Sequence, residues 1–446
     1  MAVSMDHPTV KRFQEKQAER SLAPAPVDAD WLRQVCLAAG ADDVGFVEVA
    51  RAELADQRAD ILAVLPQAQT LIAFVCRMNR AAIRSPARSV ANGEFHITGD
   101  QVDETAHRIV AALEQAGVCA INPAMGFPME MDRFSAGKTW VVSHKPVAVA
   151  AGLGQMGIHR NVIHPQFGNF ILLGTVIMAA TVTTCDHPID YNPCLSCKLC
   201  VAACPVGAIG ADESFNFAAC YTHNYREFMG GFTDWVDLLV DSPDSRAYRQ
   251  QMSRDETASL WQSLSFGANY KAAYCMAVCP AGEDVIGPFL ANRREYLQEV
   301  VKPLQEKVET VYVIAGSDAE AHVARRFPHK QTKRVHNGLT PTSIQTFLRE
   351  LPHAFQPEQA AGLDATYHFT FTGREERQAT VIIRDKQVEV QEGHQGASTL
   401  RLSADSDTWV KFLQKEQSLM WAILRRQIRI KGNPRLLLAF SKCFPT

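Results

Sequence analysis

The sequence predicts an α+β protein built from several domains. Its 446 residues exceed what one hydrophobic core usually organises, since domains of roughly 100–200 residues are the norm. Hydrophobic residues make up 47% of the chain and charged residues 21%, which is typical of a folded protein. Helical and strand patterns lie on both sides of a segment, 185–290, that is rich in cysteine and proline. These observations favour two α/β domains with a loop-rich domain between them.

The first α/β domain is expected over 30–184, after an N-terminal extension and linker at 1–29. The extension begins with a polar helical pattern, and two prolines at 24 and 26 disfavour regular structure in the linker. Apolar periodicity predicts helices at 31–39, at 100–117 with Asp100 as its cap, and at 143–151. Short apolar runs predict strands at 44–49, 71–76 and 170–182.

The chain beyond residue 290 predicts a linker helix and a second α/β domain. A charged helix near 291–301, interrupted at Pro303, occupies a linker over 291–310. The last domain is expected over 311–446. Its elements are a strand at 367–373, a hairpin at 379–390, an amphipathic helix pair at 407–426, a strand at 427–432 and a helix at 434–442.

Charge and hydropathy exclude several classes of protein. The net charge is −3, with 45 Lys and Arg against 48 Asp and Glu, whereas nucleic-acid binders are usually basic. No apolar run approaches the roughly 20 residues that a membrane helix needs, and the N-terminus has no apolar core of a signal peptide. We therefore expect a cytoplasmic protein that binds no nucleic acid and whose twelve cysteines stay reduced.

Seven cysteines lie between residues 194 and 279, and their spacing predicts iron–sulfur clusters. Cys194, Cys197, Cys200 and Cys204, followed by proline, form the bacterial ferredoxin run, in which three thiolates bind one cluster and the fourth binds another. Cys279, also followed by proline, is expected to complete the first cluster. Zinc is the competing interpretation, although zinc sites favour two separated pairs of ligands.

The second cluster is expected to have only three cysteine ligands. Cys204 and Cys275 remain after the first cluster is assigned, and Cys220 is the obvious third ligand. A fourth cysteine would be expected at position 272 or 269, where the chain has alanine and asparagine. The cluster is therefore a three-iron cluster or a four-iron cluster with another ligand. The candidates for that ligand are His223 and Cys185.

Residues 151–175 are dense in glycine, which lets the backbone approach a ligand closely. Gly152, Gly154 and Gly157 fit the dinucleotide-binding pattern, but a helix rather than a strand is expected to precede them, which disfavours a nicotinamide site. The glycines could also do no more than shape a turn between a helix and a strand.

The order of these motifs resembles that of the epoxyqueuosine reductases and reductive dehalogenases. The glycine-rich segment, the ferredoxin run and the Cys275–Cys279 pair follow one another over roughly residues 30–290. The resemblance implies a nitroreductase-like α/β domain that binds cobalamin and a ferredoxin-like domain with two clusters. It implies that the corrinoid lies near Gly152, Gly154, Gly157, Asn161, Pro165, Gly168, Gly174 and Thr175.

Two departures from the family limit what the resemblance implies. The family's aspartate acid has no counterpart at the matching place, where Lys138 stands nearest; His144 and His159 are the other candidate proton donors. Nothing basic replaces the elements that hold tRNA, so a tRNA substrate is not expected. Reduced ferredoxin or flavodoxin is the expected electron donor.

Residues from about 360 to the end resemble the sterol-carrier-protein-like lipid-binding domain. The strand at 367–373, the hairpin, the apolar helix at 417–424 and the Cys443-Phe-Pro ending carry this resemblance. It implies an apolar ligand, or a module for dimerisation and substrate presentation.

Three functions are compatible with these features. The first is a cobalamin-dependent iron–sulfur reductase, of dehalogenase or epoxide-reductase type, for a small or apolar substrate. The second is an iron–sulfur electron-transfer protein that serves a partner enzyme and has no corrinoid. The third is a lipid-binding scaffold, which the seven cysteines at ligand spacing argue against.

Overall fold

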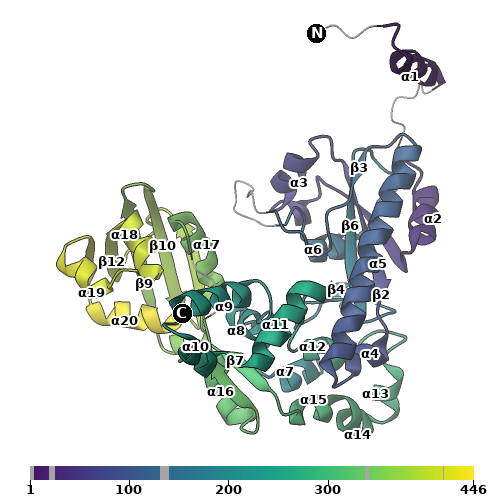
Figure 1. Cartoon of the computed structure of the whole chain (residues 1–446). Helices are drawn as coiled ribbons and strands as arrows, with labels where there is room; N and C mark the ends of the chain where they lie inside the picture. The colour runs from purple at the N-terminus through teal and green to yellow at the C-terminus, as the bar shows by residue number, and fades with distance from the viewer. Residues whose placement is uncertain (1–4, 20–25, 131–139, 337–340, 415, 446) are drawn as a thin grey trace. The chain divides into compact units, whose positions relative to one another are not determined.

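The fold is known from a computed structural model that describes residues 5–19, 26–130, 140–336, 341–414 and 416–445 (Figure 1). Its contacts divide the chain into two units. The first unit comprises Met1–Arg77, Thr98–Gln155 and Ile171–Asn192. The second comprises Met78–Ile97, Met156–Phe170 and Pro193–Thr446. The predicted α+β class is confirmed.

A four-stranded antiparallel sheet in the order β1-β2-β6-β3 forms the centre of the first unit. Its strands are β1 (Asp43–Glu48), β2 (Thr70–Arg77), β6 (Ile171–Met178) and β3 (Ala120–Ile121). Strand β2 is buried at every position but its last, which explains its continuous apolar sequence. The shorter helices of this unit are α2 (Ala29–Ala39), α3 (Arg58–Val64), α6 (His144–Ala150) and a 3₁₀ turn at Ala52–Leu54, and α1 (Pro8–Glu19) precedes them.

Helix α5 (Arg88–Gln115) corrects one prediction, because it starts well before the expected cap at Asp100. Its first turns bury polar residues that helical periodicity does not count as core. Glu94 accepts a hydrogen bond from the backbone N–H of Asn79 (2.6 Å), and Asn92 donates to the carbonyl of Tyr270 (3.2 Å). Although α5 has 28 residues, no helix in the described ranges is long and apolar enough to cross a membrane.

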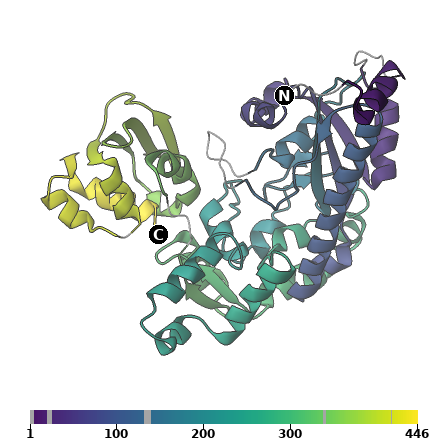
Figure 2. The same ribbon diagram turned by 45° about the horizontal axis from the view of Figure 1, so that its top comes forward.

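The cysteine-rich part of the second unit is more helical than its sequence predicts (Figure 2). Strands β7 (Thr310–Val313) and β8 (Gln331–Arg334) pair in parallel across α16 (Asp318–Arg326). Strand β5 (Val162–Ile163) belongs to this unit, and β4 (Gln155–Met156) lies at its boundary. Its other helices are α4 (Arg80–Arg84), α7 (Leu199–Ala203), α8 (Phe217–Asn224), α9 (Gly230–Asp241), α10 (Ser245–Gln251), α11 (Arg254–Phe266), α12 (Tyr274–Ala277), α13 (Gly287–Ala291), α14 (Arg293–Tyr296) and α15 (Lys302–Glu306).

Pro303 does not interrupt the helix that leads out of this segment, contrary to the prediction. A π-helical turn at Leu297–Val301 joins α14 to α15, and Pro303 lies in the first turn of α15. At that position the missing N–H of proline costs no intrahelical hydrogen bond.

The C-terminal part contains a five-stranded sheet in the order β11-β10-β9-β12-β13. Strands β9 and β12 pair in parallel and the other neighbours antiparallel, so β11 and β13 are its edges. Aromatic side chains fill its core, with Phe369 in ring contact with Phe347, Phe371 and Trp409. The elements are α17 (Ile344–Ala354), a 3₁₀ turn (Glu358–Ala360), β9 (Ala365–Thr372), β10 (Arg377–Arg384), β11 (Gln387–Glu392), β12 (Leu400–Asp405), α18 (Ser406–Leu413), α19 (Leu419–Leu424), β13 (Ile428–Gly432) and α20 (Pro434–Cys443).

Because this aromatic core lies wholly within residues 344–443, a fragment of residues 341–446 is expected to fold by itself. In it, Phe369→Ala should lower the free energy of unfolding by about 3–5 kcal/mol, the usual cost of removing a buried aromatic ring. Leu438→Ala, at a side chain that is 67% exposed, should cost under about 0.5 kcal/mol. Urea titration followed by circular dichroism measures both. Equal effects of the two substitutions, or an unfolded fragment, would contradict the assignment of this core.

Candidate metal centre

Cys194, Cys197, Cys200 and Cys279 line one pocket in the second unit. These are the four thiols that their spacing assigns to the first cluster, and the structure brings them together. Cys279, far away in sequence, reaches the pocket because α12 packs against α7. The remaining lining residues are Ile158, His159, Leu195, Lys198, Pro280 and Ala281.

The backbone between the first three cysteines adopts a conformation that favours glycine, although no glycine is present. Ser196 has a φ of 47° and Lys198 a φ of 60°, and α7 starts directly after Lys198. Left-handed residues other than glycine persist where the surrounding structure requires them, and they cluster at functional sites. Here they turn the chain twice within six residues, so that successive cysteines face one pocket.

Three of these thiols, those of Cys197, Cys200 and Cys279, are costly to ionise without a cation. Burial, reinforced by neighbouring thiols, raises the pKa of Cys279 to about 12 and raises the pKa of Cys200 and Cys197 as well. Metal ligation requires thiolates, and a cationic metal core lowers the pKa of the thiols that bind it. The donor set therefore fits an iron–sulfur cluster, which would supply that positive charge.

The cysteine spacing suits a cluster better than the alternative of zinc, whose sites favour two separated pairs of ligands. Among the residues with described positions, no three His, Cys, Asp or Glu side chains are arranged to hold a single metal ion. One zinc ion draws its four ligands close together, whereas a four-iron cluster is larger and holds its thiolates further apart.

Cys204, Cys220 and Cys275, assigned to the second cluster, also lie in the second unit. The Cys204 sulfur is buried and accepts a hydrogen bond from the backbone N–H of Ala208 (3.3 Å). Cys220, on α8, and Cys275, on α12, both lie near the half-buried Tyr225, whose pKa is raised by desolvation and further by Cys220, Tyr270 and Cys275. Position 272 carries no metal ligand, and the backbone N–H of Ala272 donates to the side chain of Asn224 (2.8 Å).

His223, a candidate fourth ligand, lies three residues after Cys220 on α8. Its ring is fully buried and its Nδ1 accepts the backbone N–H of Tyr312 (3.3 Å), while its Nε2 has no hydrogen-bond partner in the described part of the chain. Burial, with Lys271 and Arg88 nearby, lowers the pKa of His223 to about 3, so the imidazole is neutral. A neutral imidazole with a free nitrogen is able to bind a metal.

The other candidate, Cys185, belongs to the first unit and hydrogen-bonds Glu48. Burial raises its pKa to about 11. A residue that the sequence analysis missed is His322, whose ring lies against Gly207, three residues after Cys204. Its Nε2 is likewise buried without a partner among the described residues, and burial lowers its pKa. No spacing rule connects position 322 to the cysteine run.

The chain's own atoms occupy the space beside four glycines of the 151–175 segment. A Cβ at Gly152 would meet the carbonyl oxygen of His187, and one at Gly174 would meet the ring of Phe74, both within the first unit. In the second unit, a Cβ at Gly157 would meet His159, and one at Gly168 the carbonyl of Ala281. Packing within the chain thus accounts for glycine at these positions, and they form no open cradle for a corrinoid.

Other residues of this segment contact the chain as well. The Pro165 carbonyl accepts the backbone N–H of Glu283 (2.9 Å), and the Asn161 carbonyl accepts that of Gly157 (2.9 Å). Gly154 has a φ of 155°, near the edge of the range that favours glycine.

The three candidate proton donors differ in setting. His144 is half-buried, contacts Thr175 through Nδ1 (2.9 Å) and the Ala124 carbonyl through Nε2 (3.2 Å), and desolvation lowers its pKa. His159 lines the four-cysteine pocket and contacts Asn169 through Nε2 (3.2 Å). Lys138 lies outside the described residues.

Comparison with family models places two known domains on this chain. Residues 187–210 match the model of the 4Fe-4S binding domain, and residues 344–445 match that of the SCP-2 sterol transfer family. Together with the four-cysteine pocket, the first match defines an iron–sulfur protein.

The chain is also similar to curated epoxyqueuosine reductases. That of Bacillus anthracis is 35% identical over 175 residues, which are 39% of this chain and 38% of that protein. That of Cellulophaga algicola is 30% identical over 103 residues, 21% of this chain and 33% of that protein. The chain therefore spans little more than a third of the length of these relatives. The resemblance to this family, and to sterol carrier proteins at the C-terminus, is confirmed.

Solved structures give distant similarities only. An epoxyqueuosine reductase in complex with a tRNA stem loop is 18% identical and covers 62% of this chain and 78% of its own, with a TM-score of 0.36. Sterol carrier protein 2 of Yarrowia lipolytica is 9% identical and covers 23% of this chain and 92% of its own, with a TM-score of 0.21.

Anaerobically purified protein is expected to contain about seven or eight iron atoms, the sum of two clusters of the ferredoxin type. Cys197→Ser should remove about four of them, because Cys197 shares its pocket with three other ligands of one cluster. Cys119→Ser, at an exposed cysteine outside the site, is the matched control and should leave the iron content unchanged. Metal analysis and visible absorption measure the change. Bound zinc with negligible iron would disprove the assignment.

Proposed function

We propose that this chain is an iron–sulfur reductase. It takes electrons one at a time from reduced ferredoxin or flavodoxin and passes them through two clusters to a small or apolar substrate. The reaction is a reduction of dehalogenase or epoxide-reductase type. The convergence of Cys194, Cys197, Cys200 and Cys279 on one pocket carries this proposal, and similarity to the epoxyqueuosine reductases supports it.

The surroundings of the first cluster suit electron transfer. Ile158, Leu195 and Ala281 line its pocket and restrict access of water. Solvent exposure and hydrogen bonds to sulfur are among the factors that set a cluster's potential. Cys200 and Cys204 lie at α7, and Cys275 and Cys279 at α12, so each of these two segments carries one ligand of each proposed cluster, which favours a short path for the electron.

For the second cluster, we propose three cysteine ligands and His223. Cys220 and His223 lie one turn apart on α8, and the free, buried Nε2 of His223 has no other role in the described part of the chain. Imidazole in place of thiolate makes the ligand set less negative, which raises a cluster's potential.

We further propose that segment 151–175 binds cobalamin, with Lys138 or His159 as proton donor. The order of the motifs shared with the reductive dehalogenases and epoxyqueuosine reductases supports this proposal. The packed glycines give this proposal no support.

The substrate is proposed to be apolar and not a nucleic acid. The match to the SCP-2 sterol transfer family suggests that the C-terminal domain binds or presents an apolar molecule. A homodimer joined through this domain belongs to the same proposal. One similar structure is an epoxyqueuosine reductase with a bound tRNA stem loop, but the net charge of −3 gives this chain no general attraction for polyanions. A cytoplasmic location belongs to the same proposal.

One observation favours a second candidate, an electron-transfer protein without its own corrinoid. Atoms of the chain itself occupy the space beside Gly152, Gly157, Gly168 and Gly174, where a corrinoid would have to approach. Without a corrinoid, the clusters would serve a partner enzyme. Cobalamin titration separates the two candidates.

His223→Ala is expected to convert the second cluster to a three-iron form, because it removes the proposed fourth ligand. His223→Cys should restore a four-iron cluster by supplying a thiolate at the same position. Electron paramagnetic resonance of oxidised and reduced protein distinguishes the two cluster types. His329→Ala, at an exposed histidine, is the control. An unchanged spectrum in His223→Ala would remove His223 from the ligand set.

Cluster-replete protein titrated anaerobically with cobalamin is expected to bind one equivalent. Lys138→Ala should bind it equally well and yet turn over more slowly by about 10²–10⁴-fold, the usual contribution of a proton donor. Absorption changes report binding, and consumption of a halogenated or epoxide substrate reports turnover. Absence of cobalamin binding, with both clusters reduced normally by flavodoxin, would establish the electron-transfer candidate instead.

A further inference from the structure

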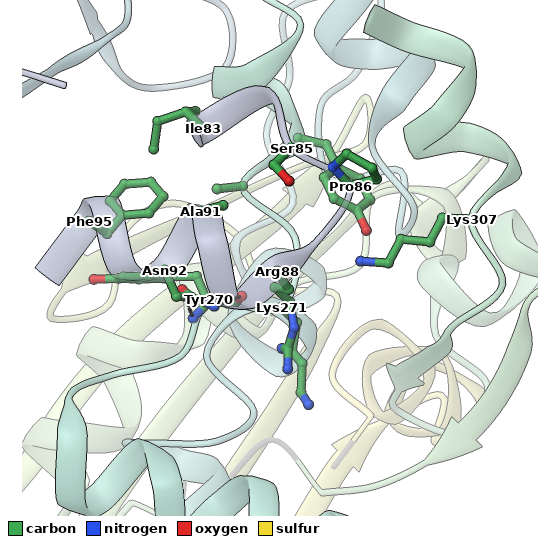
Figure 3. Close-up of a pocket in the computed structure, with 12 residues that line it drawn as sticks. Ile83, Ser85, Pro86, Arg88, Ala91, Asn92, Phe95, Tyr270, Lys271 and Lys307 are labelled. Carbon is green, nitrogen blue, oxygen red and sulfur yellow. Dashed lines mark hydrogen bonds between the residues drawn. The ribbon is translucent and has the colours of Figure 1, made fainter. Parts of the chain in front are cut away.

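A second pocket in the second unit is lined by side chains that the proposed electron path does not use (Figure 3). It lies between the start of α5 and the segment that leads into α12. About 350 Å³ of its space is not filled by atoms, and part of that is open to solvent.

Three cations line this pocket: Arg88, Lys271 and Lys307 (Figure 3). Two carboxylates near the pocket neutralise them only in part. Arg88 and Lys271 share Glu227, with Arg88 at 3.6 Å and Lys271 in direct contact with the same oxygen.

The third cation also shares its carboxylate. Lys307 lies 3.8 Å from Glu309, which Lys330 approaches more closely at 2.8 Å. Four cations therefore share two carboxylates, and the group has an excess of positive charge. These cations are partly desolvated. Desolvation, followed by the nearby positive charge of Arg88, lowers the pKa of Lys271 to about 7.

The hydrogen-bonding capacity of these cations is not exhausted. Nη1 of Arg88 is buried and has no hydrogen-bond partner in the described ranges of the chain. A buried donor without a partner is unfavourable, and an anion in the pocket would satisfy it and offset the charge. The side chain of Asn92, which also lines the pocket, bonds the N–H and the carbonyl of Tyr270 instead.

The opposite wall is apolar. Phe95 and Tyr270 lie with their ring centroids 5.2 Å apart, and Ile83 and Ala91 complete this side. Such a wall offers nothing to a bare inorganic ion but buries apolar surface of an organic one.

We propose that this pocket binds a small organic carboxylate. Its carboxylate meets Arg88 and Lys307, and its apolar or aromatic body lies against Phe95 and Tyr270. The proposal does not depend on the proposed function, since none of these residues is a cysteine ligand. Tyr274, which lines the pocket, directly precedes Cys275, a proposed ligand of the second cluster, in the chain.

The test is calorimetric titration of the full, cluster-loaded chain under anaerobic conditions with benzoate, its neutral analogue benzamide, and sulfate. Benzoate is expected to bind saturably at one site. Benzamide lacks the charge and should bind at least about tenfold more weakly, since charge-assisted hydrogen bonds are about twice as strong as neutral ones. Sulfate lacks the apolar body and should also bind more weakly than benzoate.

Two variants locate the site. Arg88→Gln and Lys307→Gln should each weaken benzoate binding about tenfold, whereas Lys302→Gln, at an exposed lysine on α15, should not. If Arg88→Gln fails to fold, Lys307→Gln still decides the matter, because Glu309 keeps Lys330 as its partner. The proposal is overturned if benzoate does not bind, if benzamide or sulfate binds as well as benzoate, or if neither variant changes the affinity.

Discussion

The second unit is organised around the need to bring four thiols, two of them buried, to one place. Thiolates repel one another, and burial makes those of Cys200 and Cys279 harder to form, so the pocket is stable in its ionised state only with a cationic core. The chain accommodates this with two left-handed residues between the cysteines and with the packing of α12 on α7. Cys204 and Cys275, on the same two helical segments, extend the arrangement toward a second cluster.

The same physical rule governs the rest of this unit: buried charge requires a partner. Glu227 and Glu309 each accept two cations, and Arg226 pairs with Asp234 at 2.5 Å. Where this pairing is incomplete, as at Arg88 Nη1 and His223 Nε2, the structure has capacity left for a group from outside the chain. Both positions lie in the part of the molecule that the cysteines organise.

The sequence predicts the features that depend on local spacing. The four-cysteine pocket follows from the 2-2-3 run and the later Cys-Pro, and strands such as β2 and β9 follow from apolar runs and alternation. The start of α5 and the passage of the helix through Pro303 could not be predicted in this way. The former depends on the contact of Asn92 with Tyr270, which is distant in sequence, and the latter on a π-helical turn.

Helices α9 to α11 and the cationic pocket were also beyond sequence reasoning. The helices bury few apolar residues on a regular face; α9, for example, buries only Gly230 and Gly231. The pocket assembles residues 88, 271 and 307 from three separate segments, none of which carries a motif. His322 could not be predicted for the same reason, because only the folded chain brings it to Gly207.

The two edges of the C-terminal sheet have opposite charge. On β11, Glu389 and Glu392 are exposed, and on β13, Arg429 and Lys431 are exposed. Exposed edge strands can pair with those of another copy and start aggregation, and charged side chains are a common protection. Pairing of two identical edges, which a two-fold axis would require, is opposed here by like charges. Only unlike edges attract each other, so growth between copies would have to join β11 of one copy to β13 of the next, and salt weakens both this attraction and the repulsion between like edges.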